Sequence, residues 1–495
     1  MVSTGGAPGS VFPPGTYAAA TWSIPANYGG MTAAILRRSR LFAEQAGVRV
    51  RILTFDPLLD VEAARAELTA RGELVPGVTL HNLWEDLRSL PDEAVGAVRG
   101  ARPRARPRAA SPSERVRTVD DDRGEARETL HFREDGSLAA TDLRTVAGHQ
   151  VTLFTRDGRR GRRWWSGRAV YRYWVASVLG TVPAYVVVDA KSLVPFFARF
   201  RGGQTRTVHV VHGAHLAAGA PDAFGPLSPT RRSMVKDFDR FDAVVLLTEG
   251  QRRDVIERIG PRGHAYVIPN STDMPEVRSP GDRDVLAGAV LARLDGNKRV
   301  GHAIKAVKLA AQRTGLPVRL DVYGDGPDRE RLARQAARVP GVTLHGHEPD
   351  AVDRLEEASF LLLTSRNEGQ ALTLAEAMAR GCVPVAYDVR YGPADLITDK
   401  VDGVLVPDVG PDALAGAVEW LVTREQEVLD RMRKAARATA RGFSDERVLA
   451  RWAELFHDLS SPDRGRRHVR AERLSSVRMV VGMLPGAVRA KRRSG

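Results

Sequence analysis

Cysteine is almost absent from this sequence, since Cys382 is its single cysteine in 495 residues. No intramolecular disulfide can form, which excludes a disulfide-stapled secreted scaffold and fits a reducing cytoplasm. Positive charge is absent from the start of the chain, where Arg37 is the first cation, so the basic beginning of a secretory signal is missing. We therefore expect a cytoplasmic protein.

Long apolar segments are also missing. The uncharged run from Tyr173 to Val188 is interrupted by Gly180 and Pro183. It is shorter than the ~20 apolar residues that a membrane-spanning helix needs. We interpret it as the end of a helix followed by a buried strand.

The composition is that of an ordinary soluble protein, with 43% apolar and 27% charged residues. The net charge of +14 is unevenly distributed, because ten Lys and Arg residues follow Ser461 against only Asp463 and Glu472. This basic tail could contact an anionic membrane face or a polyanionic acceptor, or act only as a solubilising appendage. No nucleic-acid-binding module is recognisable, so we expect no nucleic-acid partner.

Strand and helix patterns alternate through the C-terminal half, from about Asp284 to Ala440. Such alternation predicts a parallel sheet that helices cover on both faces. The predicted strands are 285–293, 318–323, 342–344, 359–363, 383–386 and 403–406, and the predicted helices include 300–314, 329–338 and 372–380.

Glu368 and Glu376 lie eight positions apart across the start of the predicted helix that follows the strand ending at Leu363. Ligands bind at the carboxyl ends of strands in such sheets. Gly369 would let backbone N–H groups approach an anion at the helix N-terminus. The pattern predicts a phosphate held by backbone amides, with one carboxylate on each side. A surface Glu with a helical partner would give the same sequence.

Two cations, Arg293 and Lys298, follow the strand that begins this half of the chain. Placed at the end of a strand, they could converge on one diphosphate, although a solvated basic turn is the simpler alternative. Gly324 lies in a tight Gly-x-Gly turn after the next strand, which is weak evidence for a nucleotide by itself.

With these residues, the sequence resembles the retaining glycosyltransferases of the GT-B fold, of the family-4 type. The resemblance implies an α/β protein with two Rossmann-like doubly wound domains. It implies that Arg293 and Lys298 hold the donor diphosphate, that Glu368 lies by the donor sugar, and that Glu376 binds the ribose. The remaining donor-binding predictions are Gly29, Gly30, Asn270, Gly324, Gly369, Gln370, Ala371 and Leu372.

The N-terminal half begins with a strand at 17–22, and Gly29 and Gly30 precede a helix at about 33–45. Further on, His209 is expected to be a packed or surface residue. His212 and His215 lie at a strand's carboxyl end, where the family places a histidine near the transferred sugar. The sequence does not decide which of the two histidines is catalytic, and either of them could have a structural role.

The segment from Tyr387 to Ile397 carries a narrower likeness, to the α-glycosyltransferases of poly(glycerol phosphate) and poly(ribitol phosphate) wall teichoic acids. Its turn could present Tyr391 to an acceptor, although a merely structural turn explains the same residues. No Asp-x-Asp sequence with a metal role is evident, so we expect no obligatory metal or other cofactor.

An insertion interrupts the N-terminal domain at about residues 100–160. Residues 101–117 are rich in Arg, Pro and Ala and predict a flexible linker. Strand patterns at 128–132, 138–143 and 150–155, with Gly-containing turns between them, predict a small antiparallel β-module. In the family such an insertion mediates oligomerisation, which implies a homo-oligomer.

The predicted organisation is an acceptor-side domain at 1–275, a donor-binding domain at 276–460 and the basic tail at 461–495. The predicted function is that of a hexosyltransferase. It would move a hexose or N-acetylhexosamine from a nucleoside diphosphate sugar, expected to be a UDP-sugar, to a hydroxyl of an anionic polyol phosphate. A protein or lipid-linked acceptor, and a non-catalytic polyanion-binding protein of the same fold, are the alternatives.

Overall fold

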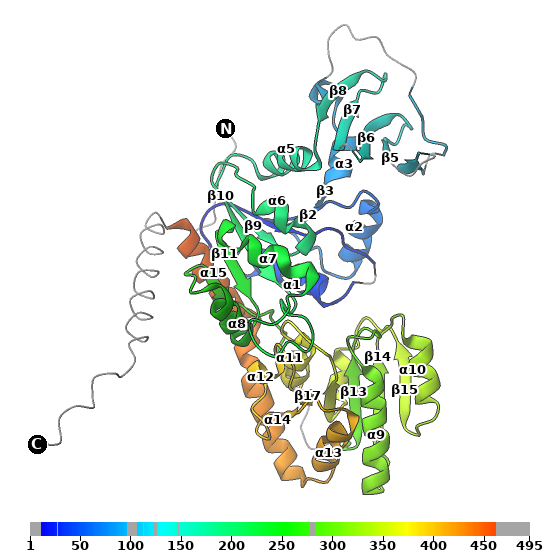
Figure 1. The fold of residues 1–495 in the computed structure, drawn as a ribbon, viewed down its shortest axis with the longest axis vertical. Coiled ribbons are helices and arrows are strands. Elements are labelled where there is room, and N and C mark those ends of the chain that lie inside the picture. Colours follow the sequence, from blue (N-terminus) through cyan, green and yellow to red (C-terminus); the bar gives the residue numbers. More distant parts are fainter. Residues whose placement is uncertain are drawn as a thin grey trace, which may run out of the picture. The chain divides into compact units, whose positions relative to one another are not determined.

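The computed structural model describes residues 11–26, 28–96, 106–111, 113–121, 126–146, 148–276 and 283–461. The chain divides into two compact units (Figure 1). The first comprises Met1–His209 and Asp237–Phe241, and the second Val210–Lys236 and Asp242–Gly495. The predicted domain boundary between 275 and 276 stays a prediction. The predicted basic tail lies, from residue 462 on, outside the described residues.

The first unit contains a parallel sheet in the order β3-β2-β1-β9-β10. Strand β9, which pairs with β1 and β10, is buried along its whole length, as expected for a strand covered on both faces. Helix α1 follows β1, as predicted, but begins at Gly30. The strands are β1 (Thr16–Ala20), β2 (Val50–Thr54), β3 (Val78–Asn82), β9 (Ala184–Val188) and β10 (Thr205–Val211), and the helices α1 (Gly30–Glu44), α2 (Val61–Ala70), α3 (Leu83–Arg88), α4 (Asp92–Val95), α5 (Gly167–Leu179) and α6 (Val194–Phe197).

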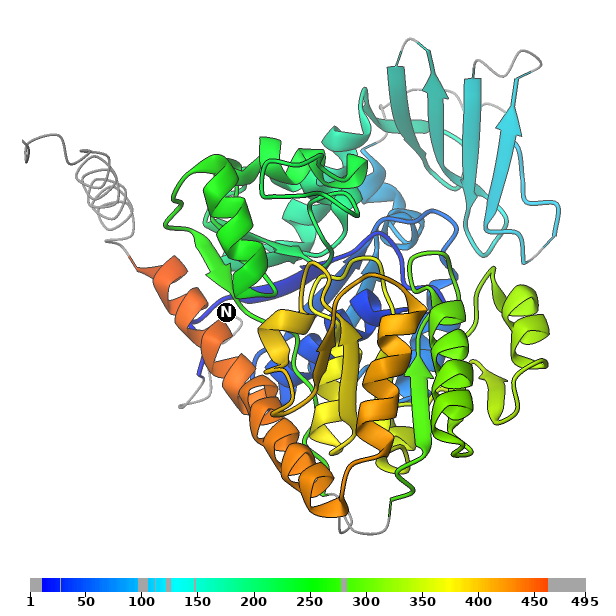
Figure 2. The ribbon, with the colours of Figure 1, turned by 60° about the horizontal axis from the view of Figure 1, so that its bottom comes forward.

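An antiparallel sheet in the order β4-β5-β6-β7-β8 is inserted between β3 and β9, and Figure 2 shows it as a separate layer. The predicted β-rich insertion is therefore confirmed. Strands β4 and β8 were not expected, and the predicted linker ends inside β4. The strands are β4 (Val116–Asp120), β5 (Ala126–Phe132), β6 (Leu138–Thr145), β7 (Gly148–Phe154) and β8 (Arg160–Trp164).

The inserted sheet packs on α3 through a flat ring contact. The His131 ring stacks on Trp84 with a centroid distance of 4.0 Å and an interplanar angle of 2°. Both side chains are buried. A small apolar core of Leu130, Phe132, Leu138 and Phe154 stabilises the sheet from within.

The second unit contains a six-stranded parallel sheet in the order β15-β14-β13-β16-β17-β18. In Figure 1, α9, α13 and α14 flank its strands. Helix α9 runs over Val300–Thr314, as its apolar periodicity predicts. The strands are β13 (Ala287–Leu291), β14 (Arg319–Tyr323), β15 (Val342–Gly346), β16 (Phe360–Leu363), β17 (Val383–Tyr387) and β18 (Val404–Val406), and the helices α9, α10 (Arg329–Ala336), α11 (Leu372–Ala379), α12 (Pro393–Leu396), α13 (Pro411–Val422), α14 (Gln426–Ala440) and α15 (Asp445–Ser460).

The second unit also contains the parallel pair β11 (Ala243–Leu246) and β12 (Ala265–Val267), with α7 (Arg232–Lys236) and α8 (Glu249–Ile259). Cys382 lies in the core of this unit and is fully buried. Burial raises the pKa of its thiol to about 12.

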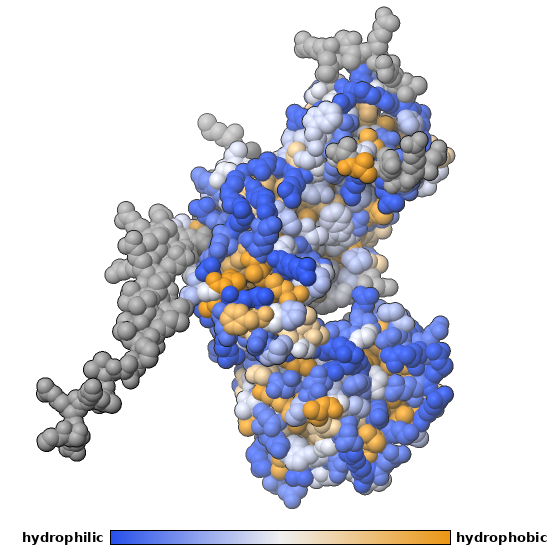
Figure 3. All heavy atoms as spheres, viewed as in Figure 1, coloured by the Kyte–Doolittle hydropathy of each residue, from blue (hydrophilic) through white to orange (hydrophobic). Residues whose placement is uncertain are grey.

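The surface seen in Figure 3 is mainly hydrophilic, with one larger apolar patch near the middle of the view and smaller apolar groups elsewhere. Among the described residues, no helix has both the length and the apolar character that crossing a membrane requires.

Candidate active site

Glu368 lies in the loop between β16 and α11, where it pairs with Lys298 from the loop after β13. The Lys298 Nζ to Glu368 Oε1 distance is 2.6 Å, and the two side chains are 27% and 12% exposed. Strands β13 and β16 are neighbours in the sheet, which is why both loops end at the same edge. The structure therefore brings together two of the predicted donor residues, as an ion pair of opposite charges.

The backbone around Lys298 is fixed from two sides. The Asp295 carboxylate accepts hydrogen bonds from the backbone N–H groups of Asn297 at 3.0 Å and Lys298 at 3.2 Å. The Thr364 hydroxyl donates to the Lys298 carbonyl at 2.7 Å. Arg293 differs from Lys298, because its side chain is 74% exposed and lies 3.6 Å from Asp295. Its guanidinium is therefore available to an incoming anion.

Arg299 holds the end of β16 in place, a role that the sequence did not reveal. It has a positive φ of 47°. Its guanidinium donates to the carbonyls of Thr364 and Ser365, each at 2.8 Å, and pairs with Asp408 at 2.9 Å. The residue next to the predicted phosphate-binding lysine thus supports the loop that carries Glu368.

Glycine is required at Gly324 by the close packing of two loops. Its φ is 138°, and a Cβ there would overlap with the carbonyl oxygen of Ala292. The Leu294 N–H also donates to the carbonyl of Asp325 at 2.9 Å. The Gly-x-Gly turn therefore supports the loop of Arg293, and this contact is sufficient reason for its glycine.

The start of α11 is tied to Asn270 by the side chain of Gln370, which is buried. Its amide oxygen accepts from the Asn270 N–H at 2.7 Å, and its amide nitrogen donates to the Asn270 carbonyl at 3.0 Å. Ala371, the N-cap, has a φ of 61°. Leu372 begins the helix, whose first N–H groups have no acceptor within the helix. Glu376 lies half-buried further along it.

Gly369 lets the loop between β16 and α11, which carries Glu368, contact the loop after β10, which carries His212 and His215 and is called the histidine loop. A Cβ at this position would overlap with the carbonyl oxygen of His212. The amide of Gln251 donates to the next carbonyl, that of Gly213, at 2.9 Å. His212 is half-buried. His209 is buried, with its Nδ1 at 2.9 Å from the carbonyl oxygen of Val188, in agreement with a packing role.

His215 is a fully buried imidazole whose two ring nitrogens have no hydrogen-bond partner within the part of the chain that the structure describes. Burial lowers its pKa to about 4, and the nearby guanidinium groups of Arg258, Arg390 and Arg231 contribute. The ring is therefore neutral near pH 7 and has one donor and one acceptor nitrogen left to satisfy.

Tyr391 packs against His215 instead of facing solvent. The two rings are stacked at 5.5 Å between centroids, with an interplanar angle of 7°. The buried Tyr391 hydroxyl donates to Asp254 at 2.8 Å. Its N–H donates to the Glu368 carbonyl at 3.0 Å, and the Glu368 N–H donates to the Arg390 carbonyl at 2.9 Å. Asp254 was not among the predicted residues.

Gly29 and Gly30 lie in the first unit, at the start of α1. Nothing lies within 4 Å of a Cβ built on either glycine, so internal packing does not explain them. Their assignment to the donor stays a prediction. Among the residues that the structure describes, no group of three or more His, Cys, Asp or Glu side chains could hold a metal ion.

Comparison with known proteins finds one matching family and several similar proteins. Residues 274–439 match the family described as glycosyl transferases group 1. A poly(ribitol-phosphate) alpha-N-acetylglucosaminyltransferase of Staphylococcus aureus is 24% identical over 253 residues, which cover 50% of this chain and 50% of that protein. A poly(glycerol-phosphate) alpha-glucosyltransferase of Bacillus subtilis is 21% identical over 506 residues, which cover 88% of this chain and 74% of that protein.

Among solved structures, S. aureus TarM G117R in complex with fondaparinux, alpha-GlcNAc-glycerol and UDP is similar to this chain. The TM-score is 0.69 at 17% identity, and the match covers 89% of this chain and 99% of that one. This likeness concerns the arrangement of the helices and strands.

Proposed function

The chain carries a glycosyl transferases group 1 domain and has the GT-B fold, and from this premise we propose that it is a retaining hexosyltransferase. It moves a hexose or N-acetylhexosamine from a nucleoside diphosphate sugar to a hydroxyl of a polyol phosphate polymer of the teichoic acid type. The relatives that act on poly(ribitol phosphate) and poly(glycerol phosphate) support this acceptor. The UDP in a similar structure supports a UDP-sugar as donor.

The observation that carries the proposal is the ion pair of Lys298 with Glu368 at the edge of the six-stranded sheet of the second unit. A partly buried Lys beside a carboxylate is poised to exchange this partner for a diphosphate, which carries more negative charge. The exposed guanidinium of Arg293 supplies a second cation. Charge that develops on the departing diphosphate would be stabilised by these groups and by the N-terminus of α11.

The reaction needs no group beyond donor, acceptor and these side chains. The acceptor oxygen forms a bond to the anomeric carbon on the face from which the diphosphate leaves, while the bond from that carbon to the phosphate oxygen breaks. The acceptor proton passes to the leaving phosphate oxygen, so configuration is retained. Glu376 binds the ribose hydroxyls. His215, neutral and unpartnered in the described chain, bonds hydroxyls of the transferred sugar.

The proposal includes the partners and location of the enzyme. The enzyme needs no obligatory metal. It works in the cytoplasm, on an acceptor at the inner face of the membrane, and its basic tail contacts that membrane face. Homo-oligomers form through the inserted sheet. Two alternatives remain. The same sugar transfer could take place on a protein or lipid-linked acceptor, or the protein could bind a polyanion without catalysing any reaction.

The test incubates the purified protein with a panel of sugar nucleotides, with and without poly(glycerol phosphate) or poly(ribitol phosphate), and measures the nucleoside diphosphate released. We expect release from one donor to rise strongly with polymer and to persist in a metal chelator. Stimulation by a peptide or a lipid-linked sugar, but not by either polymer, would move the acceptor to those classes. No release from any donor would indicate a non-catalytic protein.

A further inference from the structure

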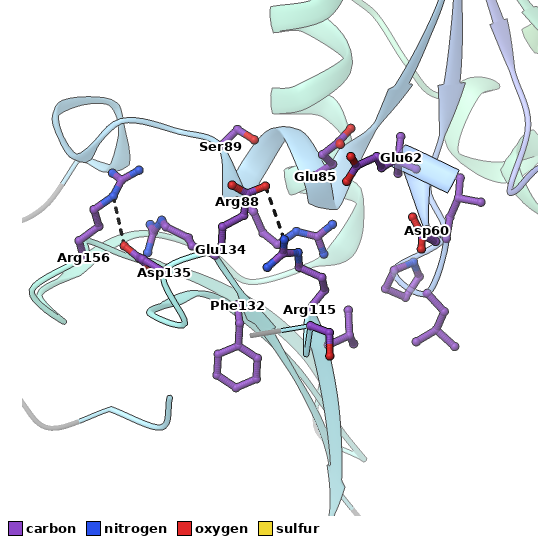
Figure 4. A pocket seen from close by; sticks show the side chains of 17 residues that line it. Asp60, Glu62, Glu85, Arg88, Ser89, Arg115, Phe132, Glu134, Asp135 and Arg156 are labelled. Atoms are coloured by element: carbon purple, nitrogen blue, oxygen red, sulfur yellow. Dashed lines mark ion pairs between the residues drawn. The ribbon is translucent and has the colours of Figure 1, made fainter. Parts of the chain in front are cut away.

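A cavity of about 870 Å³ lies in the first unit, and none of the candidate active-site residues lines it. Its wall is formed by the loop between β2 and α2, by α3, and by turns and strand ends of the inserted sheet (Figure 4). Its charged side chains include Arg88, Arg115, Asp60 and Glu134. The proposed function does not use this cavity.

Arg88 is an unusual member of the wall. Its Nη1 is buried and has no hydrogen-bond partner among the described residues. Burial is the largest cause that lowers its pKa and the positive charge of Arg115 adds to it, while the charges of Glu85 and Asp60 oppose the lowering. Figure 4 shows the Arg88 and Arg115 side chains extending into the same cavity. A buried N–H group without an acceptor is costly, so an anion that accepts from this nitrogen would be stabilised.

The carboxylates of the wall compensate Arg88 only in part. Three of them, Glu85, Asp60 and Glu134, also have partners other than Arg88. Glu85 forms a two-point ion pair with Arg65, at 2.8 and 3.0 Å. Asp60 caps α2 by accepting from the Ala63 N–H at 3.0 Å. Glu134 pairs with Arg115 at 3.5 Å, but it is 86% exposed, so this bond contributes little and can be exchanged.

The cavity is lined by both guanidinium and carboxylate groups, which indicates the kind of ligand that fits it. Guanidinium groups bind phosphate through paired N–H donors. A carboxylate that already accepts one hydrogen bond still has lone pairs that can accept from hydroxyl groups. A ligand that alternates phosphates with hydroxyl-bearing carbons matches both kinds of group, whereas a bare anion matches only the cations. The volume also exceeds the need of one phosphate, because pockets of ~300–1,000 Å³ hold ligands of drug size.

We propose that this cavity binds a stretch of the polyol phosphate acceptor, with Arg88 and Arg115 on one phosphodiester and the carboxylates of Asp60 and Glu134 on neighbouring hydroxyls. This proposal rests on the proposed function for the identity of the polymer. It assigns a second acceptor-binding site, which holds the chain without taking part in the chemistry. Longer acceptors therefore bind better than short ones.

The test measures binding of poly(glycerol phosphate) chains of increasing length by calorimetry, in the absence of donor, with wild type, Arg88→Gln and Arg160→Gln. Arg160 is an exposed residue of β8 that does not line the cavity and gives the same loss of charge. We expect Arg88→Gln to weaken long-chain binding by about tenfold, the value of one hydrogen-bonded charge pair. Arg160→Gln should stay within about twofold of wild type.

Arg115→Gln tests the same site from the inserted sheet, and it keeps the test valid if Arg88→Gln does not fold. Competition by inorganic phosphate at millimolar concentration, with no advantage of long chains, would reduce the cavity to a site for free phosphate and overturn the proposal. Equal losses in the cavity variants and in Arg160→Gln would overturn it too, since general charge would then explain binding. Because donor is absent, these outcomes are independent of whether sugar transfer occurs.

Discussion

At the scale of single residues, Lys298 and Glu368 balance each other's charge in the absence of a ligand. In the proposed mechanism, donor binding breaks this ion pair so that Lys298 can face the diphosphate, and Glu368 is then free to accept from the sugar. One exchange of partners would thus prepare both side chains for their roles.

Replacing Lys298 by Ala should lower kcat/KM about 10²- to 10³-fold, since removing one group that stabilises developing negative charge costs ~2.7 to 4 kcal/mol. Steady-state kinetics with the preferred donor measures this loss. Lys305→Ala is the matched control, because Lys305 is exposed on the following helix, α9. A Lys298→Ala enzyme within about threefold of wild type would remove Lys298 from the diphosphate site.

The sequence predicted some residues of the site and not others, for a physical reason. Lys298 and Glu368 follow strand ends, and a strand end marks the edge of a parallel sheet where ligands bind. Asp254 and Arg88 lie on helices whose sequences resemble ordinary solvent-exposed faces. Asp254 gains its role from its hydrogen bond to Tyr391, which lies 137 positions away in the sequence. Arg88 gains its role from the cavity that it lines.

At the scale of elements, the segment that follows β17 connects the loops of the site. Through Tyr391 it contacts the His215 ring, the Asp254 carboxylate and the Glu368 carbonyl. A Cβ at Gly392 would overlap with the carbonyl oxygen of Gln370. Two consecutive residues, Tyr391 and Gly392, therefore fix the positions of the histidine loop and of the loop that carries Glu368. The stacking on His215 and the hydrogen bond to Asp254 suit Tyr391 to positioning His215.

Tyr391→Leu should lower kcat about tenfold and leave the affinity for free nucleoside diphosphate within about threefold. The variant removes a ring contact worth ~0.5–1.5 kcal/mol that orients His215. Tyr391→Phe keeps the stacked ring and should recover most of the activity. Kinetics and calorimetry measure the two quantities.

Tyr387→Phe is the control for this prediction, since it removes a hydroxyl from the same region that contacts His302 at 3.1 Å. If Tyr391→Leu and Tyr387→Phe lower kcat equally, the effect is one of general packing. Full activity in Tyr391→Leu would separate Tyr391 from the function of His215.

Sequence patterns predicted a helix or strand well where the apolar periodicity of that segment alone specifies it. Helix α9 is such a case, because its own apolar residues form one buried face. Strand β8 (Arg160–Trp164) is the opposite case, since its Arg-rich sequence has little apolar pattern. It is a strand because β7 offers it an edge to pair with, at Val151 and Thr152. Such pairing cannot be read from the strand itself.

The contact of the inserted sheet with α3 should make stability depend on pH. Burial lowers the pKa of His131 from 6.5 to about 3, with Arg88 acting in the same direction and Asp142 opposing it. The unfolded chain binds this proton more readily, so stability is complete above about pH 6.5 and falls as the pH drops toward 3. Between pH 7.5 and pH 5 the loss from His131 is about 2 kcal/mol.

His131→Phe keeps a flat ring against Trp84 but cannot titrate. Denaturant unfolding at the two pH values should therefore give a smaller loss in the variant than in the wild type, by about 2 kcal/mol. His215→Phe serves as comparison, since the pKa of this second buried imidazole is also lowered. Identical losses in wild type and His131→Phe would contradict the assignment.

At the scale of the whole molecule, charge is concentrated near the C-terminus. Helix α15 ends at Ser460, so a deletion after Ser461 leaves every described element in place. We expect the deletion to raise KM for the anionic polymer and to leave KM for the donor unchanged, because the ten cations act over ~10 Å at 0.1 M salt. The difference should shrink as salt is added.

Measurements at low and high ionic strength check this prediction. Equal changes for donor and acceptor would indicate that the deleted segment supports the fold instead. The absence of any change would leave it a solubilising appendage.

The buried position of Cys382 has a practical consequence for spectroscopy. Thiol reagents attack the thiolate, and a fully buried thiol with a pKa of about 12 presents almost none. Cysteines introduced on the surface can therefore carry fluorophores or spin labels in the otherwise unchanged protein, with no need to replace Cys382 first. The time course of Cys382 modification in the unlabelled protein would in turn report how often the core of the second unit opens.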